Sequence, residues 1–250
     1  MGKLFAELFS KRYEVGIYSR GTFQTEFVVF DSIESLYHFS SYLVITTPAE
    51  EIKDIVKKIS KIDDGEKKVI FDICTFKEGF IDEYRSLPQN HSIASAHPMF
   101  GEGIETMKGR NVIVVPVKGR EQEAHHVEKF FEGFGAKVSR MNVDEHDELM
   151  KVLIGVPYFF GISYLNLISD LEGLERYGGT SFEFLSTYGK SVLNDSPEFI
   201  EEVIDHSADI LEDCIENMKI SRDEIDRLKE KYSDEIEDSY SKMYEMVGDG

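Results

Sequence analysis

Cysteine is scarce in this 250-residue sequence, which has only Cys74 and Cys214 and no CxxC pair. This scarcity excludes a disulfide framework and a cysteine-rich zinc site, and we expect no metal site. Few, widely separated cysteines are typical of a reducing compartment, so the expected location is cytoplasmic. A secretory signal is not expected either, because the first residues have helical periodicity and include the acidic Glu7.

Basic residues are also few: 28 Lys and Arg stand against 48 Asp and Glu, which gives a net charge of -20. Such a charge repels nucleic acid backbones and anionic membranes. No apolar run approaches the length of a membrane span. We therefore expect neither nucleic acid nor a membrane as a partner. Much of the excess acid lies in residues 198–249, where solvated helix faces are favoured over an acidic docking surface.

Strand-like and helix-like segments alternate over residues 1–140. This alternation predicts an α/β nucleotide-binding (Rossmann-like) domain with a mostly parallel, doubly wound sheet. The expected strands are 13–18, 26–30, 42–46, 68–72, 93–96, 111–115 and 136–139, and the expected helices are 3–11, 32–39, 49–59, a segment after Thr75, and 121–134.

The usual opening of such a domain is absent. A doubly wound domain normally begins with a strand and a glycine-rich turn before its first helix, whereas this sequence begins inside that helix. The domain is therefore expected to lack its first strand. Either translation naturally starts upstream of Met1 or the domain is damaged, and the first explanation is favoured because the remaining pattern is well formed.

From about residue 143 only helical patterns occur, which predicts an all-α C-terminal domain over residues 141–250. Residues 149–168 are almost wholly apolar, as in a buried core helix or an interface helix. An apolar stripe from Ile200 to Met218 is expected to run for at least five turns, and Ser221 with Glu224 resembles a capping box for a last helix through Met246. The apolar segment and the stripe are expected to join two copies into a homodimer.

His97 is the first candidate for catalysis. It lies in the segment Ser95-Ala96-His97-Pro98-Met99-Phe100-Gly101, at the carboxyl end of a short expected strand. Open α/β sheets bind their ligands at that edge, and a neutral imidazole can accept a proton at cytoplasmic pH. The alternative is a histidine that stabilises a turn by bonding to the backbone.

The motif His97-Pro98-Met99-Phe100-Gly101 resembles that of the prephenate dehydrogenases, enzymes of tyrosine biosynthesis. Three further segments resemble the family in the same order: residues 1–5 the end of its glycine-rich turn, 72–77 its D-x-x-S-x-K element, and 145–147 the acidic-His-Asp that opens its helical domain. The resemblance implies an NAD(P)-dependent oxidative decarboxylation of prephenate to 4-hydroxyphenylpyruvate, in which His97 polarises the ring hydroxyl.

Other site residues follow from the same resemblance. Thr75 stands in place of the family serine, where its hydroxyl could donate to nicotinamide or substrate, or cap the next helix. Gly2, Thr46, Thr47, Pro48 and Lys77 are the positions expected to contact the dinucleotide.

The choice of cofactor is argued from the end of the second strand of such a domain. An acid there holds the ribose of NAD, whereas a basic residue accommodates the extra phosphate of NADP. This sequence has Ser19-Arg20 at that point and no acid until Glu26. NADP is therefore favoured over NAD, with an exposed loop arginine as the alternative.

Two positions depart from the family in the helical domain. Glu183 stands where the family has an arginine that binds a prephenate carboxylate, and Tyr158 stands where it has a histidine; Arg176 is the nearest replacement cation. A carboxylate repels a dianionic substrate. The alternatives are therefore a dehydrogenase of the same build that acts on arogenate, whose amino group Glu183 could bind, or on another small acid, and a non-catalytic dimeric binding or regulatory homologue.

Overall fold

The computed structural model describes residues 1–21, 24–62, 65–216 and 218–247. The chain divides into two compact units, Met1–Asp147 and Glu148–Gly250. The first is an α/β unit and the second is helical, so the expected fold class is confirmed. The first unit ends with Asp147, whose carboxylate accepts hydrogen bonds from the backbone amides of Lys77 and Glu78. The boundary expected after residue 140 stays a prediction.

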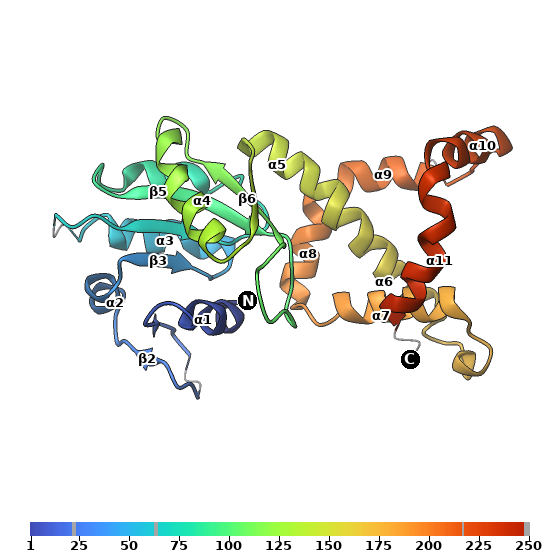
Figure 1. Ribbon diagram of the computed structural model, residues 1–250, viewed down its shortest axis with the longest axis horizontal. Helices are drawn as coiled ribbons and strands as arrows, with labels where there is room; N and C mark the ends of the chain where they lie inside the picture. Colours follow the sequence, from blue (N-terminus) through green and yellow to red (C-terminus); the bar gives the residue numbers. More distant parts are fainter. Residues whose placement is uncertain (22–23, 63–64, 217, 248–250) are drawn as a thin grey trace. The chain divides into compact units, whose positions relative to one another are not determined.

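The first unit is built on a five-stranded sheet with the strand order β3-β4-β5-β6-β7 (Figure 1). Its strands are β3 (Tyr42–Ile45), β4 (Val69–Asp72), β5 (Ser92–Pro98), β6 (Asn111–Pro116) and β7 (Lys137–Arg140). The β5–β6 pair is antiparallel and the other three pairs are parallel. The sheet is thus mostly parallel, as expected. His97 lies inside β5, opposite Ile113 of β6, one residue before the strand ends.

A second, two-stranded parallel sheet is formed by β1 (Gly16–Ile17) and β2 (Val28–Val29). Both strands are shorter than the sequence predicts. Gly16 leaves room for a neighbouring ring, since a Cβ atom there would lie 2.4 Å from the Phe30 side chain. In the doubly wound strand order a further strand normally lies between those that β1 and β3 represent. Among the described residues, no strand joins β1 to β3, so the two sheets are separate.

Helices α1 and α4 cover one face of the larger sheet. Their apolar side chains, such as Phe5 and Phe131, form one cluster with Phe71 of β4, Ala94 and Ala96 of β5, and Val112 and Val114 of β6. Alternate residues of a strand point to the same face, which explains this spacing. The helices of the unit are α1 (Gly2–Ser10), α2 (Ile33–Phe39), α3 (Ala49–Ile59), the 3₁₀ helix η1 (Ile81–Ser86), the 3₁₀ helix η2 (Glu121–Glu123) and α4 (Ala124–Gly133).

The expectation of a helix directly after Thr75 is wrong. Thr75 lies in a bend, and the next helical residues are those of η1, which begins at Ile81. Two features interrupt the helical pattern: the Lys77 amide donates a hydrogen bond to the Asp147 carboxylate, and Gly79 adopts a left-handed conformation with φ +87°. Thr75 therefore does not cap an α-helix.

The second unit contains helices joined by short turns. They are α5 (Val143–Met150, which begins in the first unit), the π-helical turn η3 (Lys151–Gly155), α6 (Val156–Ile168), the 3₁₀ helix η4 (Leu174–Arg176), α7 (Thr180–Val192), α8 (Pro197–His206), α9 (Ala208–Glu216), α10 (Arg222–Lys231) and α11 (Ser233–Val247). The capping box of Ser221 and Glu224 is confirmed at the start of α10.

Two expected long helices are each broken in two. The stripe from Ile200 to Met218 is interrupted at Ser207, whose hydroxyl donates to the Val203 carbonyl and whose backbone ends α8. The last helix is interrupted at Tyr232, where the backbone leaves the helical conformation. The expectation of a continuous helix at these two places was therefore wrong.

Residues Val143–Ile168 form one continuous helical segment of 26 residues. Pro157 lacks the amide proton that continues a helical ladder, and the wider turn η3 lies just before it, closed by the Val156 amide donating to the Lys151 carbonyl. The segment is long and apolar enough to cross a membrane by length and composition alone, with a mean hydropathy of 1.4. The expectation that the chain has no membrane partner stays a prediction. A helix that a protein partner covers meets the same criteria.

The expectation that residues 149–168 form a buried core helix is wrong. Only 11% of the most apolar window in Val143–Ile168 is buried within the chain. Val152, Leu153, Phe160 and Leu167 are all exposed. The alternative expectation, an interface helix, stays open.

Candidate functional site

Three neighbouring strands bring candidate residues to one edge of the sheet. Because β3, β4 and β5 run parallel, their carboxyl ends meet at the same edge. Thr46 and Thr47 follow β3, Thr75 lies in the loop after β4, and His97 lies at the end of β5. The first two loops touch, since the Cys74 thiol donates to the Thr47 carbonyl over 3.5 Å.

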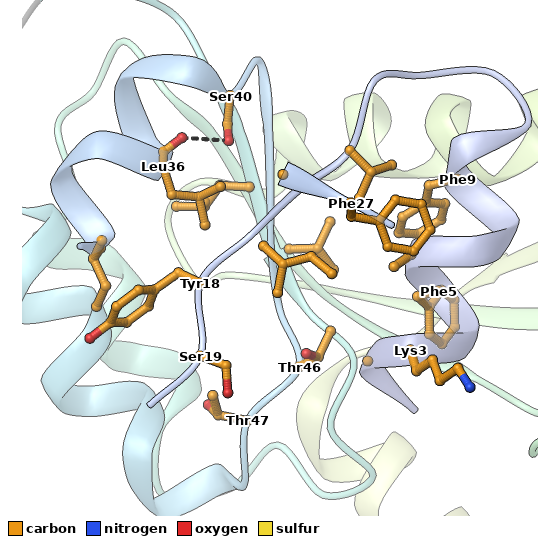
Figure 2. A pocket seen from close by; sticks show the side chains of 18 of the residues that line it. Lys3, Phe5, Phe9, Tyr18, Ser19, Phe27, Leu36, Ser40, Thr46 and Thr47 are labelled. Carbon is orange, nitrogen blue, oxygen red and sulfur yellow. Dashed lines mark hydrogen bonds between the residues drawn. The ribbon is translucent and has the colours of Figure 1, made fainter. Parts of the chain in front are cut away.

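A cavity of about 1600 Å³ opens at this edge, lined by residues of α1, β1, β3 and α3 (Figure 2). Figure 2 shows Ser19, Thr46 and Thr47 toward one end of it, with Phe5 and Phe9 of α1 along another side. Six of the seven predicted cofactor residues line this cavity: Gly2, Ser19, Arg20, Thr46, Thr47 and Pro48. The structure thus brings together positions that are far apart in the sequence.

The lining of the cavity suits a dinucleotide in two respects. Helix α1 begins at Gly2 beside the end of β3, so closely that a Cβ atom on Gly2 would lie 2.8 Å from the Thr46 hydroxyl. The first amides of a helix have no partner within it and attract phosphate. In addition, the Thr47 hydroxyl oxygen is buried without a hydrogen-bond partner. Both features offer hydrogen bonds to a bound polar ligand.

Glu51 would compete with a bound phosphate for Arg20. The Arg20 guanidinium donates to the Glu51 carboxylate of α3, and the Ser19 hydroxyl accepts the Gly21 amide proton over 3.3 Å. Arg20 is largely exposed. Glu51 therefore lies beside Arg20, the residue that is expected to bind the 2′-phosphate of NADP.

His97 is buried, with 5% of its surface exposed, and it heads a chain of hydrogen bonds. Its Nδ1 atom lies 3.1 Å from Nε2 of His146, and Nδ1 of His146 lies 2.6 Å from Oδ1 of Asp147. The Asp147 carboxylate also accepts the backbone amide protons of Lys77 and Glu78. Helix α5 thereby supplies two residues that support the histidine of β5.

Lys77 is fully buried beside this chain. Its ammonium group donates to Asp72 Oδ1 at 3.3 Å, to the Ala96 carbonyl at 2.8 Å and to the Cys74 carbonyl. Asp72 also accepts the Tyr84 hydroxyl over 3.1 Å. These three acceptors match the three protons of an ammonium. Lys77 therefore holds the ends of β4 and β5 together, and its predicted contact with the cofactor stays a prediction.

The surroundings shift several pKa values. Burial lowers the pKa of His97 well below its usual value, and the charges of Lys77 and His146 lower it further. Burial also lowers the pKa of His146, against the opposing hydrogen bond to Asp147. For Asp147, burial raises the pKa, but the hydrogen bonds from His146 and from the Glu78 and Lys77 amides outweigh it and the net shift is downward. His97 is therefore neutral and Asp147 ionised at neutral pH.

The remaining predicted site residues are placed as follows. Thr75 is partly buried in the loop after β4. In the second unit, the Tyr158 hydroxyl donates to Asp195 over 2.6 Å, and burial together with that carboxylate raises the Tyr158 pKa. Glu183 is exposed in the first turn of α7. The roles of these three residues in binding stay predictions.

The sequence pattern does not predict the contacts of His146 with His97 and with Asp147. His146 and Asp147 lie in the segment 145–147 that resembles the family, and a histidine beside an aspartate at the start of a helix is the local signal that points to them. The pattern also does not predict Asp72 and Tyr84 as partners in the buried cluster. Among the described residues, no group of three or more His, Cys, Asp or Glu side chains is arranged to hold a metal ion.

Comparisons with known proteins add a family. The profile described as "Prephenate dehydrogenase, nucleotide-binding domain" matches residues 18–140. These residues include the cavity-lining Ser19, Thr46 and Thr47 as well as His97. No curated protein sequence matches the chain.

Several solved structures share the fold. Prephenate dehydrogenase from Aquifex aeolicus, in complex with hydroxyphenyl propionate and NAD+, is 17% identical with a TM-score of 0.69, over 98% of this chain and 93% of that one. Arogenate dehydrogenase from Synechocystis is 13% identical with a TM-score of 0.57, over 88% and 80%. Plasmodium falciparum pyrroline carboxylate reductase with NADP bound is 14% identical with a TM-score of 0.50, over 99% and 90%.

Proposed function

We propose that this chain, whose nucleotide-binding unit belongs to the prephenate dehydrogenase family, catalyses an NAD(P)-dependent oxidative decarboxylation of prephenate to 4-hydroxyphenylpyruvate, a step of tyrosine biosynthesis. One observation carries the proposal. A buried, neutral histidine, His97, lies at the same sheet edge as the cavity that gathers the predicted dinucleotide residues.

His97 acts as the proton acceptor in this reaction. Its lowered pKa keeps the imidazole neutral, so it can take the proton of the ring hydroxyl as that carbon becomes a carbonyl. The bound nicotinamide supplies the acceptor for the hydride that leaves the same carbon. The bond to the ring carboxylate then breaks with release of CO2, its electron pair aromatises the ring, and His97 returns the proton to the phenolate oxygen.

The cofactor is held by α1 and the ends of two strands. The free amides at the start of α1 would hold the pyrophosphate, Gly2 would permit its close approach, and the Thr47 hydroxyl would supply a hydrogen bond. Ser19 and Arg20 lie where the adenosine ribose is expected. Arg20 supports NADP, but its pairing with Glu51 weakens that preference, so both NADP and NAD belong in the proposal.

Substrate binding is assigned to the helical unit. Tyr158 and Glu183 are the proposed contacts, and an exposed carboxylate at 183 favours a substrate with an amino group. Arogenate is therefore the second candidate substrate. The exposed apolar helix residues support a homodimer formed through the helical unit. The two free cysteines support a cytoplasmic location.

The proposal is tested by incubating the purified protein with prephenate or arogenate and with NAD or NADP. Absorbance of the reduced nicotinamide should grow with one of the four pairs, and His97→Asn should abolish it. The rate with prephenate against that with arogenate decides between the two substrates. No turnover with any pair, together with no binding of either dinucleotide by calorimetry, would favour a non-catalytic homologue.

A further inference from the structure

The hydrogen-bond chain behind His97 has a defined direction. Asp147 is its fixed end, because its carboxylate accepts every contact it makes: Lys77 and Glu78 amides on Oδ2 at 3.0 and 2.7 Å, and the Lys77 amide on Oδ1 at 3.1 Å. Amide N–H groups only donate. The remaining contact of Oδ1, with His146 Nδ1 at 2.6 Å, must therefore also be accepted by the carboxylate.

This direction passes along both imidazoles. A neutral imidazole has one N–H and one bare nitrogen, so His146, which donates from Nδ1, presents a bare Nε2. That Nε2 lies 3.1 Å from His97 Nδ1, which must carry the proton. The bare nitrogen of His97 is then Nε2.

We propose that His146 is a positioning residue which, held by Asp147, fixes His97 in the tautomer that is protonated on Nδ1 and leaves Nε2 as the proton acceptor. This proposal concerns the site of the proposed function and rests on that function for its catalytic consequence. The pair also serves the protonated state. When Nε2 gains a proton, the Nδ1–H of the imidazolium still has an acceptor, and the Asp147 charge lies one imidazole away.

The other charged groups around His97 cannot take over this role. Lys77 is the other charged group that lowers the His97 pKa, and its three protons already go to Asp72 and to two carbonyls. Asp72 is engaged by Lys77, by the Tyr84 hydroxyl and by the Cys74 amide. Within the described residues, His146 is thus the side chain that contacts His97 Nδ1 and can accept a hydrogen bond from it.

The Asp147→Asn variant changes the tautomer of His97 and keeps the packing around residue 147. The amide oxygen of asparagine keeps the Lys77 and Glu78 amides only if it takes the place of Oδ2, because an NH2 group there would face two donors. The NH2 group then takes the place of Oδ1 and donates to His146 Nδ1. His146 becomes protonated on Nε2 and donates to His97 Nδ1, so the proton of His97 moves to Nε2. The shape is conserved and the base is blocked.

The experiment is imidazole ¹⁵N NMR on the full chain labelled at histidine, at neutral pH and without ligand. In the natural protein His97 should show a bare Nε2 and a protonated Nδ1; in Asp147→Asn the two should exchange. His91, a second buried histidine that contacts Tyr37, is the internal reference and should not change. Protonation of His97 on Nε2 in the natural protein, or an unchanged His97 tautomer in a folded Asp147→Asn, would overturn the proposal.

A second variant and kinetics complete the test. His146→Phe removes the acceptor for His97 Nδ1, so the single tautomer should give way to a mixture. With the active substrate pair, both variants should lower kcat by about 10²- to 10⁴-fold, as expected for lost general-base catalysis, and leave KM unchanged. A correct tautomer pattern in a protein with no turnover would support this proposal and overturn the proposed function, so the two failures are distinguishable.

Discussion

At the scale of single residues, the site depends on where its positive charge is placed. Lys77 is fully buried, its ammonium group donates to acceptors at three positions, and it does not line the cavity. Burial is the main reason that the His97 pKa falls, and the nearby Lys77 charge, which disfavours a second positive charge, lowers it further. The lysine therefore serves His97 indirectly, by keeping the imidazole neutral.

The acid side of the pH profile follows from this placement. A base works only above its pKa, and burial, Lys77 and His146 all lower that of His97 below 6.5. We expect kcat/KM to stay level as the pH falls from 8 to 6.5 and to decline only at lower pH. Steady-state kinetics across this range measure it, with stability monitored by circular dichroism. A decline centred at or above pH 6.5 would contradict the assignment of His97 as the base.

The pair of Arg20 and Glu51 makes cofactor preference adjustable. Glu51→Gln removes the charge that engages Arg20 and leaves the guanidinium to bind the 2′-phosphate of NADP. Because exposed ion pairs contribute about 0–1 kcal/mol, the affinity for NADP should rise up to about fivefold while that for NAD stays unchanged. Calorimetric titration measures both. Glu50→Gln, the neighbouring acid on α3 that also lines the cavity, is the matched control. Equal gains in both variants would refute a specific role for the pair.

At the scale of elements, sequence patterns located helices better where a backbone signal marks their ends. Pro48 precedes α3, which covers the predicted residues 49–59, and the capping box starts α10 as predicted. No glycine or proline marks the breaks at Ser207 and Tyr232, so the apolar periodicity predicted one continuous helix at each place. The prediction of a helix after Thr75 was wrong for another reason. The Lys77 amide bonds to Asp147, which lies 70 residues further along the chain.

The candidate site shows the same division. His97, Thr46 and Thr47 were found because strand ends and a short motif are local features of the sequence. The contact of His97 with His146 spans 49 residues and depends on how α5 packs against β5. Local patterns do not specify such a contact, so the partner of the base could be found only in the folded chain.

The contact between α6 and α7 is made by two glycines, which gives a test at this scale. A Cβ atom on Gly189 would lie 2.7 Å from the Gly161 carbonyl oxygen and 2.7 Å from the Leu165 side chain, and a backbone oxygen cannot easily move. Gly189→Ala should lower the free energy of unfolding by about 1–3 kcal/mol through overpacking, reduced by at most about 1 kcal/mol of helix propensity. Urea unfolding measures it. Lys190→Ala, exposed on the same helix, should change stability by less than about 0.5 kcal/mol.

At the scale of the whole molecule, charge and apolar surface are distributed unequally. The net charge of -20 keeps copies apart in general. The second unit nevertheless exposes large apolar side chains along Val143–Ile168, where Leu167 is 74% exposed. An apolar surface of this kind marks an interaction site. In the proposed homodimer, a second copy of the chain covers this surface.

The homodimer is tested by sedimentation equilibrium on the natural chain and two variants. An interface that holds a stable dimer buries about 1,200–2,000 Å² in total, so a carboxylate at its centre should separate the copies. Leu153→Asp, at a side chain 49% exposed on the apolar helix, should sediment as a monomer. Val28→Asp, at a side chain 50% exposed in the first unit, adds the same charge elsewhere and should remain a dimer. If the natural chain sediments as a monomer, or both variants keep the dimer, the helical unit does not join two copies through this face. The exposed apolar residues of Val143–Ile168 would then require a different partner.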